Sequence, residues 1–386
     1  MAERWEVFAV VAAIDCDMHL FEPVDMWERY CDPAGRDAAL RMVPDDLGYV
    51  WLVSGDRRIW LAEPHQPKRP STIGTYQNRQ RDGLPSTMDY EEFAAPYSDP
   101  AAVVRHLDSS GFDAAVLFPN YGIVFERPLE PDPRATLVNM GAWNRWICEE
   151  IVPAGGGRLH PVGHVNLTDR SWLLGQLAAL GGGDLRLALI PPGLVNGVRL
   201  SDPSLDWAWS AFVDHGITPV FHVAEQPRPF DDAWYGEQGL ARLSPLSSIF
   251  LWTGVALALT DLIINGVLER HPDLRLGVME LSAVWVPLQM MMMDGGFSFA
   301  AAFNGESVPL SLRPSEYFRR QVRVAAFSYE GPASLAEQSG DIFMACSDYP
   351  HTEGTDTPLA DYAAAGVTPE SQPALFSDNI RFLLRS

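Results

Sequence analysis

Short runs of apolar, β-favouring residues recur along the chain, and each is followed by a stretch with helical patterning. A parallel strand that is buried on both faces has such a near-continuous apolar sequence. Strand then helix, repeated eight times, predicts an α/β fold of the (β/α)8 TIM-barrel type. The runs cover residues 7–17, 113–120, 160–167, 196–201, 218–225, 274–281, 322–328 and 341–350.

Two of the helical stretches are clear from their patterning. Residues 135–152 and 204–216 are helix candidates, and Gly216 occupies the position that a helix end prefers. The alternative to a barrel is a doubly wound open sheet, which normally has a glycine-rich phosphate turn after its first strand. The sequence DCDMHLFEP after the first run has no such turn, which favours the barrel.

Residues 31–100 interrupt the alternation of strands and helices. Within them, GYVWLVSGDRRIWLAEP has two alternating apolar runs around SGDRR, which is typical of a β-hairpin. The sequence that follows is rich in Pro, Gly, Arg and amide side chains and has no helical period. We interpret this segment as an insertion after the first strand that lies over the barrel mouth. No repeat or linker divides the chain, so residues 1–386 are predicted to form one barrel domain.

Composition narrows the possible partners. The chain has 386 residues, of which 47% are hydrophobic and 20% charged, and its net charge is −22. This charge argues against nucleic acid as the partner, because phosphates would be repelled. The apolar stretch at residues 245–272 contains Asp261 and polar residues, so it predicts buried helices and not a membrane span. Small molecules remain the expected partners. Four cysteines without metal-site spacing fit a reducing cytoplasm: Cys16, Cys31, Cys148 and Cys346.

Ionisable residues gather at the predicted strand ends, where barrel enzymes build their active sites. Asp17 and His19 lie two residues apart at the end of the first run and therefore on the same side of the strand. Carboxylates and imidazoles thus collect at one rim, where a divalent metal could hold the acids together. The later strand ends contribute Asn166, Arg199, His222, Glu225, Glu280, Asp348 and His351.

Each of these residues also has an ordinary structural explanation. A histidine in a strand, such as His222, is commonly a hydrogen-bonded core residue, and an Asp at a strand end, such as Asp348, commonly caps the next helix. The combination of four such residues on strands one, five and eight favours metal ligation. Arg199 and Arg81 could bind a substrate carboxylate with two hydrogen bonds, although exposed arginines are usually only solvated.

Four sequence motifs together resemble the amidohydrolase-2 family of metal-dependent barrels, relatives of aminocarboxymuconate semialdehyde decarboxylase. They are IDCDMHLFEP, FHVAE, ERHPDLRLGVMELSAVWVP and CSDYPH, in the order of the family. The resemblance implies one divalent metal, zinc first and manganese second. Its ligands would be Asp17, His19, His222 and Asp348, with Asp15 as a supporting residue. The resemblance also implies a homodimer or a higher homo-oligomer.

The chain departs from the family pattern in two places. Better-known decarboxylases of the family have a histidine at the end of the sixth strand, where this chain has Glu280. Asp348, together with Glu280 and His351, is therefore the candidate for proton transfer. The fourth predicted strand ends in Arg199 and has no lysine that could be carbamylated to bridge two metals, so a single metal is expected.

These observations predict a mononuclear metal enzyme acting on a small carboxylated ring or enol compound. Non-oxidative decarboxylation is favoured narrowly over hydrolysis of an amide, lactone or similar C–N or C–O bond, because both reactions use the same ligands. A barrel that has lost catalysis and serves as a binding subunit is the third possibility. Asn166, Glu225 and Tyr76 are expected to contact the substrate, along with the two arginines named above.

Overall fold

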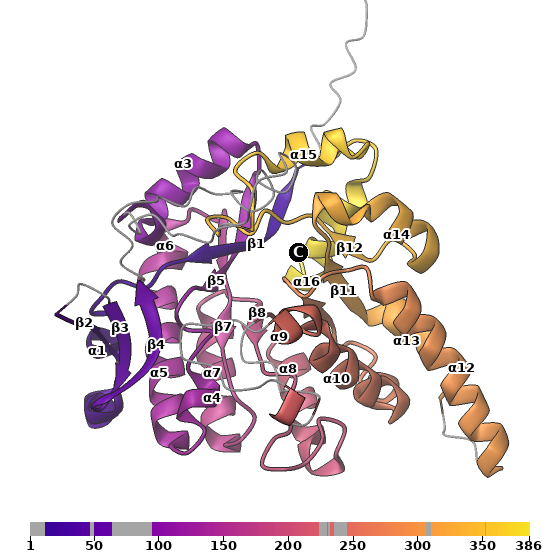
Figure 1. Cartoon of the computed structure of the whole chain (residues 1–386), viewed down its shortest axis with the longest axis horizontal. Helices are drawn as coiled ribbons and strands as arrows, with labels where there is room; N and C mark the ends of the chain where they lie inside the picture. The colour runs from indigo at the N-terminus through magenta and orange to yellow at the C-terminus, as the bar shows by residue number, and fades with distance from the viewer. Residues whose placement is uncertain are drawn as a thin grey trace, which may run out of the picture.

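Parallel strands in the described part of the chain form a barrel that helices surround (Figure 1). The computed structural model describes residues 12–46, 50–63, 95–223, 230, 232–234, 245–305, 310–351 and 353–386. The strands, in barrel order, are β1 (Ile14–Leu20), β5 (Ala114–Pro119), β6 (Leu159–Pro161) continued by β7 (Gly163–His164), β8 (Leu187–Leu189), β9 (Thr218–Phe221), β10 (Leu276–Val278), β11 (Val322–Ala325) and β12 (Phe343–Met344).

Backbone hydrogen bonds close the barrel on both sides of β1. On one side β1 pairs with β5, and β5 with β6; on the other, β7 to β12 form a continuous parallel ladder. The seam between β12 and β1 is bridged where Cys16 N donates to Ala345 O (3.0 Å) and Asp348 N donates to Asp17 O (2.8 Å). With β6 and β7 counted as one strand, the prediction of a (β/α)8 barrel is confirmed.

The barrel interior is an apolar core that is closed at the amino-terminal ends of the strands. Ile14, Cys16, Val220 and Met344 belong to one buried cluster there. The last helix, α16 (Asn379–Leu384), adds Ile380, Leu383 and Leu384 to that cluster. Each fully buried aliphatic side chain stabilises the fold by about 1.5–3 kcal/mol. A binding site is therefore expected at the carboxyl-terminal ends of the strands.

The helices pack around the barrel, and the two helices expected from the sequence are present. Asp132 caps α5 by accepting from Ala135 N (3.1 Å), and Pro133 starts it. None of the described helices is both long and apolar enough to cross a membrane. The helices are α1 (Met26–Tyr30), α3 (Pro100–Ser110), α4 (Glu126–Leu129), α5 (Pro133–Trp146), α6 (Val152–Ala154), α7 (Arg170–Gly182), α8 (Asp206–Asp214), α9 (Pro245–Ile249), α10 (Trp252–Ile264), α11 (Val267–Arg270), α12 (Val286–Asn304), α13 (Pro314–Gln321), α14 (Pro332–Ser339) and α15 (Pro358–Ala364), besides α16.

The insertion after β1 contains a small antiparallel sheet of β2 (Arg41–Pro44), β3 (Val50–Ser54) and β4 (Arg57–Glu63). The predicted hairpin is therefore confirmed, with Gly55 at φ +58° in the turn, a conformation that glycine adopts without strain. Residues 64–94 lie outside the described residues. That the insertion covers the barrel mouth therefore stays a prediction. The same holds for the prediction that residues 1–386 form one domain.

The sequence-based assignment of the fourth strand is wrong. The fourth barrel strand is β8 (Leu187–Leu189), whereas the predicted segment 196–201 forms a turn with an isolated antiparallel bridge between Val195 and Val198. Asn196 and Gly197 both have positive φ, +49° and +80°, which suits an Asn-Gly turn and not a strand. The first strand also differs, since it runs on through His19 to Leu20.

Candidate metal centre

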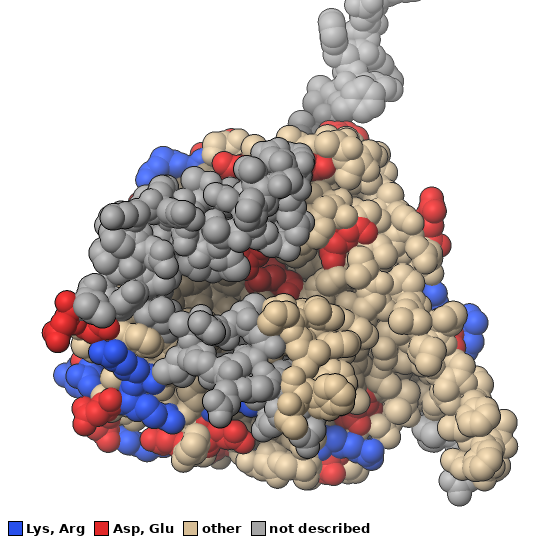
Figure 2. Space-filling model, in the orientation of Figure 1, with Lys and Arg blue, Asp and Glu red and all other residues tan. Residues whose placement is uncertain are grey.

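Five ionisable side chains from four strands meet at the carboxyl end of the barrel. Asp17 and His19 lie on β1, His222 directly follows β9, and Glu280 and Asp348 lie just beyond β10 and β12. Four of them are at most 3% exposed, and the Glu280 side chain is 12% exposed. Acidic side chains are visible at the floor of a central hollow on this face (Figure 2). We call these five residues the rim cluster.

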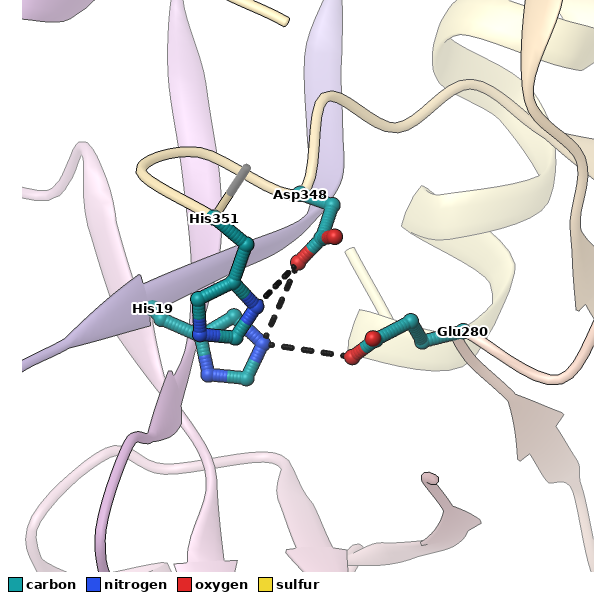
Figure 3. Close-up of side chains that lie close together, drawn as sticks. All are labelled: His19, Glu280, Asp348 and His351. Atoms are coloured by element: carbon teal, nitrogen blue, oxygen red, sulfur yellow. Dashed lines mark hydrogen bonds and ion pairs between the residues drawn. The ribbon is translucent and has the colours of Figure 1, made fainter. Parts of the chain in front are cut away.

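Three members of the rim cluster, His19, Glu280 and Asp348, point toward one another in Figure 3. His222 Nε2 lies 3.3 Å from Asp17 Oδ1 and 3.1 Å from Glu280 Oε2. His19 Nε2 lies 3.5 Å from both Glu280 Oε2 and Asp348 Oδ1, and 3.9 Å from Asp17 Oδ1. Four buried polar atoms of the rim cluster have no hydrogen-bond partner: His19 Nε2, Asp17 Oδ2, Glu280 Oε2 and Asp348 Oδ2. Buried polar atoms in folded proteins are normally paired, so this group needs a ligand.

Both imidazoles are oriented by main-chain carbonyl groups. His19 Nδ1 lies 3.1 Å from Pro119 O, and His222 Nδ1 lies 2.7 Å from Val223 O. A carbonyl oxygen can only accept a hydrogen bond, so each Nδ1 carries the hydrogen. In the neutral ring, the lone pair is then on Nε2 and faces the rim cluster. Metal-binding histidines are held in this way by a partner on the second nitrogen.

The spacing of the donor atoms fits one divalent cation. Asp17, His19 and His222 can each offer an atom within 4.8 Å of the others, and so can His19, Glu280, Asp348 and His351. Adjacent ligand atoms around an ion at about 2.1 Å are about 3.0–3.5 Å apart. The pairs given above span 3.1–3.9 Å, close to this range.

Burial sets the protonation of the rim cluster in the absence of a cation. It raises the pKa of Asp17 and of Asp348, since no water solvates their carboxylates. Burial lowers the pKa of His19 to about 3, so this ring is neutral. Burial opposes ionisation of Glu280, but the adjacent His19 and His222 lower its pKa overall. A divalent cation would relieve the repulsion among the three carboxylates.

His351 extends the rim cluster by one residue. Its Nδ1 lies 2.8 Å from Asp348 Oδ1, its Nε2 lies 2.9 Å from Asn120 Oδ1, and its ring lies over that of His19 at 3.9 Å between centroids. Burial lowers the pKa of His351, but the Asp348 carboxylate outweighs it and raises the value to about 10. The Asp348–His351 pair can therefore hold a proton that either group can carry.

Asp15 ties β1 to the loop that carries Asp348. Its Oδ1 accepts from Ser347 N (3.0 Å) and from Asp17 N (3.1 Å). The register of β1 shifts between Asp15 and Met18, so the simple alternation expected from the sequence does not hold there. This irregularity places Asp15 beside the backbone of the ligand candidates and Asp17 beside His222.

The predicted substrate-binding residues that the structure describes, Asn166 and Arg199, contact residues outside the rim cluster. Asn166 instead donates to Glu126 Oε2 (3.4 Å) and accepts from Thr168 N (2.8 Å). Arg199 does not end a strand, because it lies in the turn that follows β8. Its side chain is 59% exposed and 3.8 Å from Asp261. Three further predictions fall outside the described residues: Tyr76, Arg81 and Glu225.

Sequence reasoning missed three residues near this end of the barrel. Asn120 holds His351, and Glu126 contacts His164 Nε2 at 2.8 Å. Glu330 accepts hydrogen bonds from the loop after β10. A signal existed for Asn120, which is the polar residue that ends the second apolar run. The other two lie in loops and short helices, where position along the chain does not indicate a role.

Comparison with known proteins identifies the fold. No protein-family model matches the sequence, and neither does any curated protein. Among solved structures, an amidohydrolase from Mycobacterium avium subsp. paratuberculosis K-10 is 24% identical with a TM-score of 0.79, over 97% of this chain and 99% of that one. The chain has the barrel fold of the amidohydrolases. At this level of identity the similarity establishes the fold alone.

Two more distant structures with this barrel fold are decarboxylases. The 5-carboxyvanillate decarboxylase LigW from Sphingomonas paucimobilis is 17% identical with a TM-score of 0.62, over 97% of this chain and 99% of that one. A dihydroxybenzoic acid decarboxylase from a Polaromonas species is 13% identical with a TM-score of 0.58, over 97% of each chain, and contains manganese and the inhibitor 2-nitroresorcinol.

Proposed function

We propose that this protein is a mononuclear metal-dependent enzyme of the amidohydrolase-2 type that decarboxylates a small carboxylated ring or enol compound. The observation that carries the proposal is the convergence of Asp17, His19, His222 and Asp348, with both Nε2 atoms directed at the carboxylates. The decarboxylases that share the fold act on carboxylated aromatic rings, which supports this substrate class.

The proposed ligands are the same four residues, Asp17, His19, His222 and Asp348. A bound divalent metal would act as a Lewis acid toward the oxygens of the substrate. Zinc is the first expectation from the resemblance, and manganese is supported by its presence in several structures with the same fold. The Pro119 and Val223 carbonyl groups would keep both imidazoles in the ligating tautomer.

Proton transfer is assigned to the Asp348–His351 pair. His351 is held from both sides, by Asp348 and by Asn120, so its ring has a fixed orientation. His351 is hydrogen-bonded to Asp348, so it can return a proton to that carboxyl after the carboxyl has given one to carbon. Decarboxylation needs such a donor, since the carbon that loses CO2 must gain a proton.

Hydrolysis is the second candidate, and one observation favours it. The loop after β10 presents the Glu280 carboxylate, where the resemblance leads one to expect a histidine. A carboxylate is a suitable base for a water nucleophile, as in other metal-dependent hydrolases. The same four ligands would serve this reaction on an amide or lactone.

Isotope labelling separates the two reactions. The metal-loaded protein is tested with a panel of hydroxybenzoates, including 2,6-dihydroxybenzoate and 5-carboxyvanillate, and with a panel of aryl amides and lactones. Decarboxylation in D2O places deuterium at the former carboxyl carbon and releases an equal amount of CO2. Turnover confined to the amides and lactones, with incorporation of 18O from labelled water and no CO2, would reassign the protein as a hydrolase.

We further propose that the protein is a homo-oligomer that pairs through α12, the helix that projects from the body of the molecule (Figure 1). A stripe of apolar side chains runs along it at helical spacing and is 53–80% exposed: Leu288, Met292, Phe299 and Phe303. Gly295 lies within this stripe, with open space around it, so a second helix could approach closely. Exposed apolar patches of this kind mark interaction sites.

Charge supports a second copy of the chain as the occupant of this surface. The only ionisable side chain on α12 is Asp294, which accepts from Ser315 N (2.8 Å). Two copies of this helix can therefore pair without bringing like charges together, although each chain has a net charge of −22. Phe299→Glu is expected to convert the oligomer to a monomer in light scattering. Leu194→Glu, at an exposed apolar site elsewhere, serves as the control; a monomeric wild-type protein would contradict the proposal.

We propose a cytoplasmic location from the state of the cysteines. Cys16, Cys31, Cys148 and Cys346 are all free thiols, and three of them are buried. Free thiols are typical of proteins in a reducing compartment. Fluorescence microscopy of a tagged protein in its own cell would test the location.

A further inference from the structure

The backbone around Glu280 is held in an unusual conformation. Glu280 has φ +50° and Ser282 has φ +61°, in the left-handed region that non-glycine residues rarely adopt. Such residues cost about 1–3 kcal/mol each and persist only where their surroundings fix them. They are concentrated at functional sites, so the position of the Glu280 side chain requires an explanation.

The surroundings that fix this segment centre on Glu330. One of its carboxylate oxygens accepts from Ser282 Oγ (2.5 Å) and from Ala283 N (3.1 Å), and the other accepts from Phe327 N (2.9 Å). Glu330 thus joins the loop after β10 to the loop after β11. The loop that carries Glu280 is therefore held in place by these hydrogen bonds.

This loop directs the Glu280 carboxylate at the proposed ligands. Its Oε2 atom lies 3.1 Å from His222 Nε2 and 3.5 Å from His19 Nε2. The same two nitrogens lie 3.3–3.9 Å from the Asp17 and Asp348 carboxylates. The Glu280 carboxylate therefore lies at least as close to the two Nε2 atoms as the carboxylates of Asp17 and Asp348, which are the acidic ligands that the family resemblance implies.

We propose that Glu280 binds the metal directly as a fifth protein ligand; this inference rests on the proposed metal site. Three carboxylates and two imidazoles would then surround the ion. A donor set of three oxygens and two nitrogens suits an ion with five or six ligands, such as Mn²⁺, better than four-coordinate Zn²⁺. Glu280 therefore biases the site toward manganese, and Glu330 is the residue that positions it.

Metal affinity, measured without substrate, tests this inference. Mn²⁺ and Zn²⁺ binding to the metal-free protein is measured by calorimetry for the wild type and for Glu280→Gln, Glu280→Asp and Glu126→Gln. The Gln variant keeps the shape and removes the charge, whereas the Asp variant keeps the charge and shortens its reach. Glu126→Gln removes one charge from a side chain bonded to His164, outside the rim cluster, and is the matched control.

If Glu280 is a direct ligand, the dissociation constants of the variants should follow a specific pattern. Mn²⁺ binding should weaken by about 100-fold or more in Glu280→Gln and by about 10-fold in Glu280→Asp, with a smaller loss for Zn²⁺. Glu126→Gln should stay within about threefold of the wild type. Glu330→Gln should weaken Mn²⁺ binding by roughly 10-fold, because the Glu280 loop loses its anchor.

Three outcomes would overturn the inference, and they differ from failure of the proposed function. Mn²⁺ affinity in Glu280→Gln within threefold of the wild type would show that Glu280 is not a ligand. If Glu280→Asp binds Mn²⁺ as tightly as the wild type while Glu280→Gln binds it more weakly, the effect would be one of charge alone and not of ligation. A wild-type protein that binds neither metal would remove the metal site, and with it both the proposed function and this inference.

Discussion

The polar groups that tie α16 to the barrel differ in their pairing from those of the rim cluster. At the amino-terminal end, Thr218 Oγ1 donates to Leu383 O (2.8 Å), and Asn379 accepts from Arg323 Nε (2.6 Å) while donating to Phe343 O (2.8 Å). At the carboxyl-terminal end, the rim cluster leaves carboxylate and imidazole atoms without partners. Both ends are built from the same strands.

This difference indicates at which end of the barrel a ligand would bind. A buried polar atom without a partner costs about 1–3 kcal/mol, so a fold tolerates several of them together only where something else binds. The amino-terminal end combines paired polar groups with the apolar side chains of α16 and closes the core. Substitutions at the two ends should therefore separate metal binding from stability.

The largest effect is expected from loss of a ligand in the rim cluster. His222→Ala should lower the metal content from close to one ion per chain to less than about a tenth, and turnover by about 1,000-fold, because the imidazole supplies one of the donor atoms. Metal analysis by mass spectrometry and steady-state assays measure this. A variant that keeps its metal would exclude His222 as a ligand.

A second large effect is expected from His351, which is proposed to move a proton without binding the metal. His351→Gln should lower kcat by about 100-fold and leave the metal content unchanged, as expected for loss of a general acid. The comparison of kcat with metal content for the same preparation is the measurement. Equal losses of metal and activity would instead make His351 a ligand.

A smaller and opposite pattern is expected at the amino-terminal end. Thr218→Val removes the hydrogen bond to the Leu383 carbonyl and should lower the free energy of unfolding by about 1–2 kcal/mol. Metal content and kcat should stay at wild-type levels. Urea unfolding followed by circular dichroism gives the stability. A loss of metal at constant stability would show that the two ends of the barrel are coupled.

The smallest effect concerns the pH dependence of stability at this same end. Burial lowers the pKa of His160 below its ordinary value of 6.5, so the unfolded chain binds a proton more readily than the folded protein. The contribution of His160 to stability is therefore present above about pH 6.5 and is lost as the pH falls through the window below it. His160→Gln should flatten the pH dependence of the unfolding free energy between pH 5 and pH 7. An unchanged slope would show that His160 does not contribute.

The barrel could be predicted from sequence because its strands are buried on both faces. Seven of the eight predicted runs overlap a strand, since continuous apolar sequence reports burial directly. The fourth prediction took the wrong segment, because the turn at Asn196 is flanked by Val195 and Val198, which are typical of strands, whereas the strand itself is β8 (Leu187–Leu189). The bulge in β1 leaves no comparable trace in the sequence.

The sequence could predict only those site residues whose place in the fold follows from the end of a strand. Asp17, His19, His222, Glu280 and Asp348 follow or end strands, and the closed barrel brings such ends together. Arg199 was misplaced because its strand was misassigned. Glu330 was missed because its role depends on hydrogen bonds to Ser282 and Ala283, which lie 48 and 47 residues away along the chain.

The most direct test of the account is a crystal structure of the manganese-loaded protein with anomalous diffraction recorded on both sides of the manganese absorption edge. A metal centre at the rim cluster predicts one anomalous peak per chain, about 2.0–2.3 Å from Nε2 of His19 and His222 and from carboxylate oxygens of Asp17 and Asp348. An oxygen of Glu280 should lie at the same distance. A peak at any other place, or none in protein that turns over its substrate, would contradict a metal centre at the rim cluster.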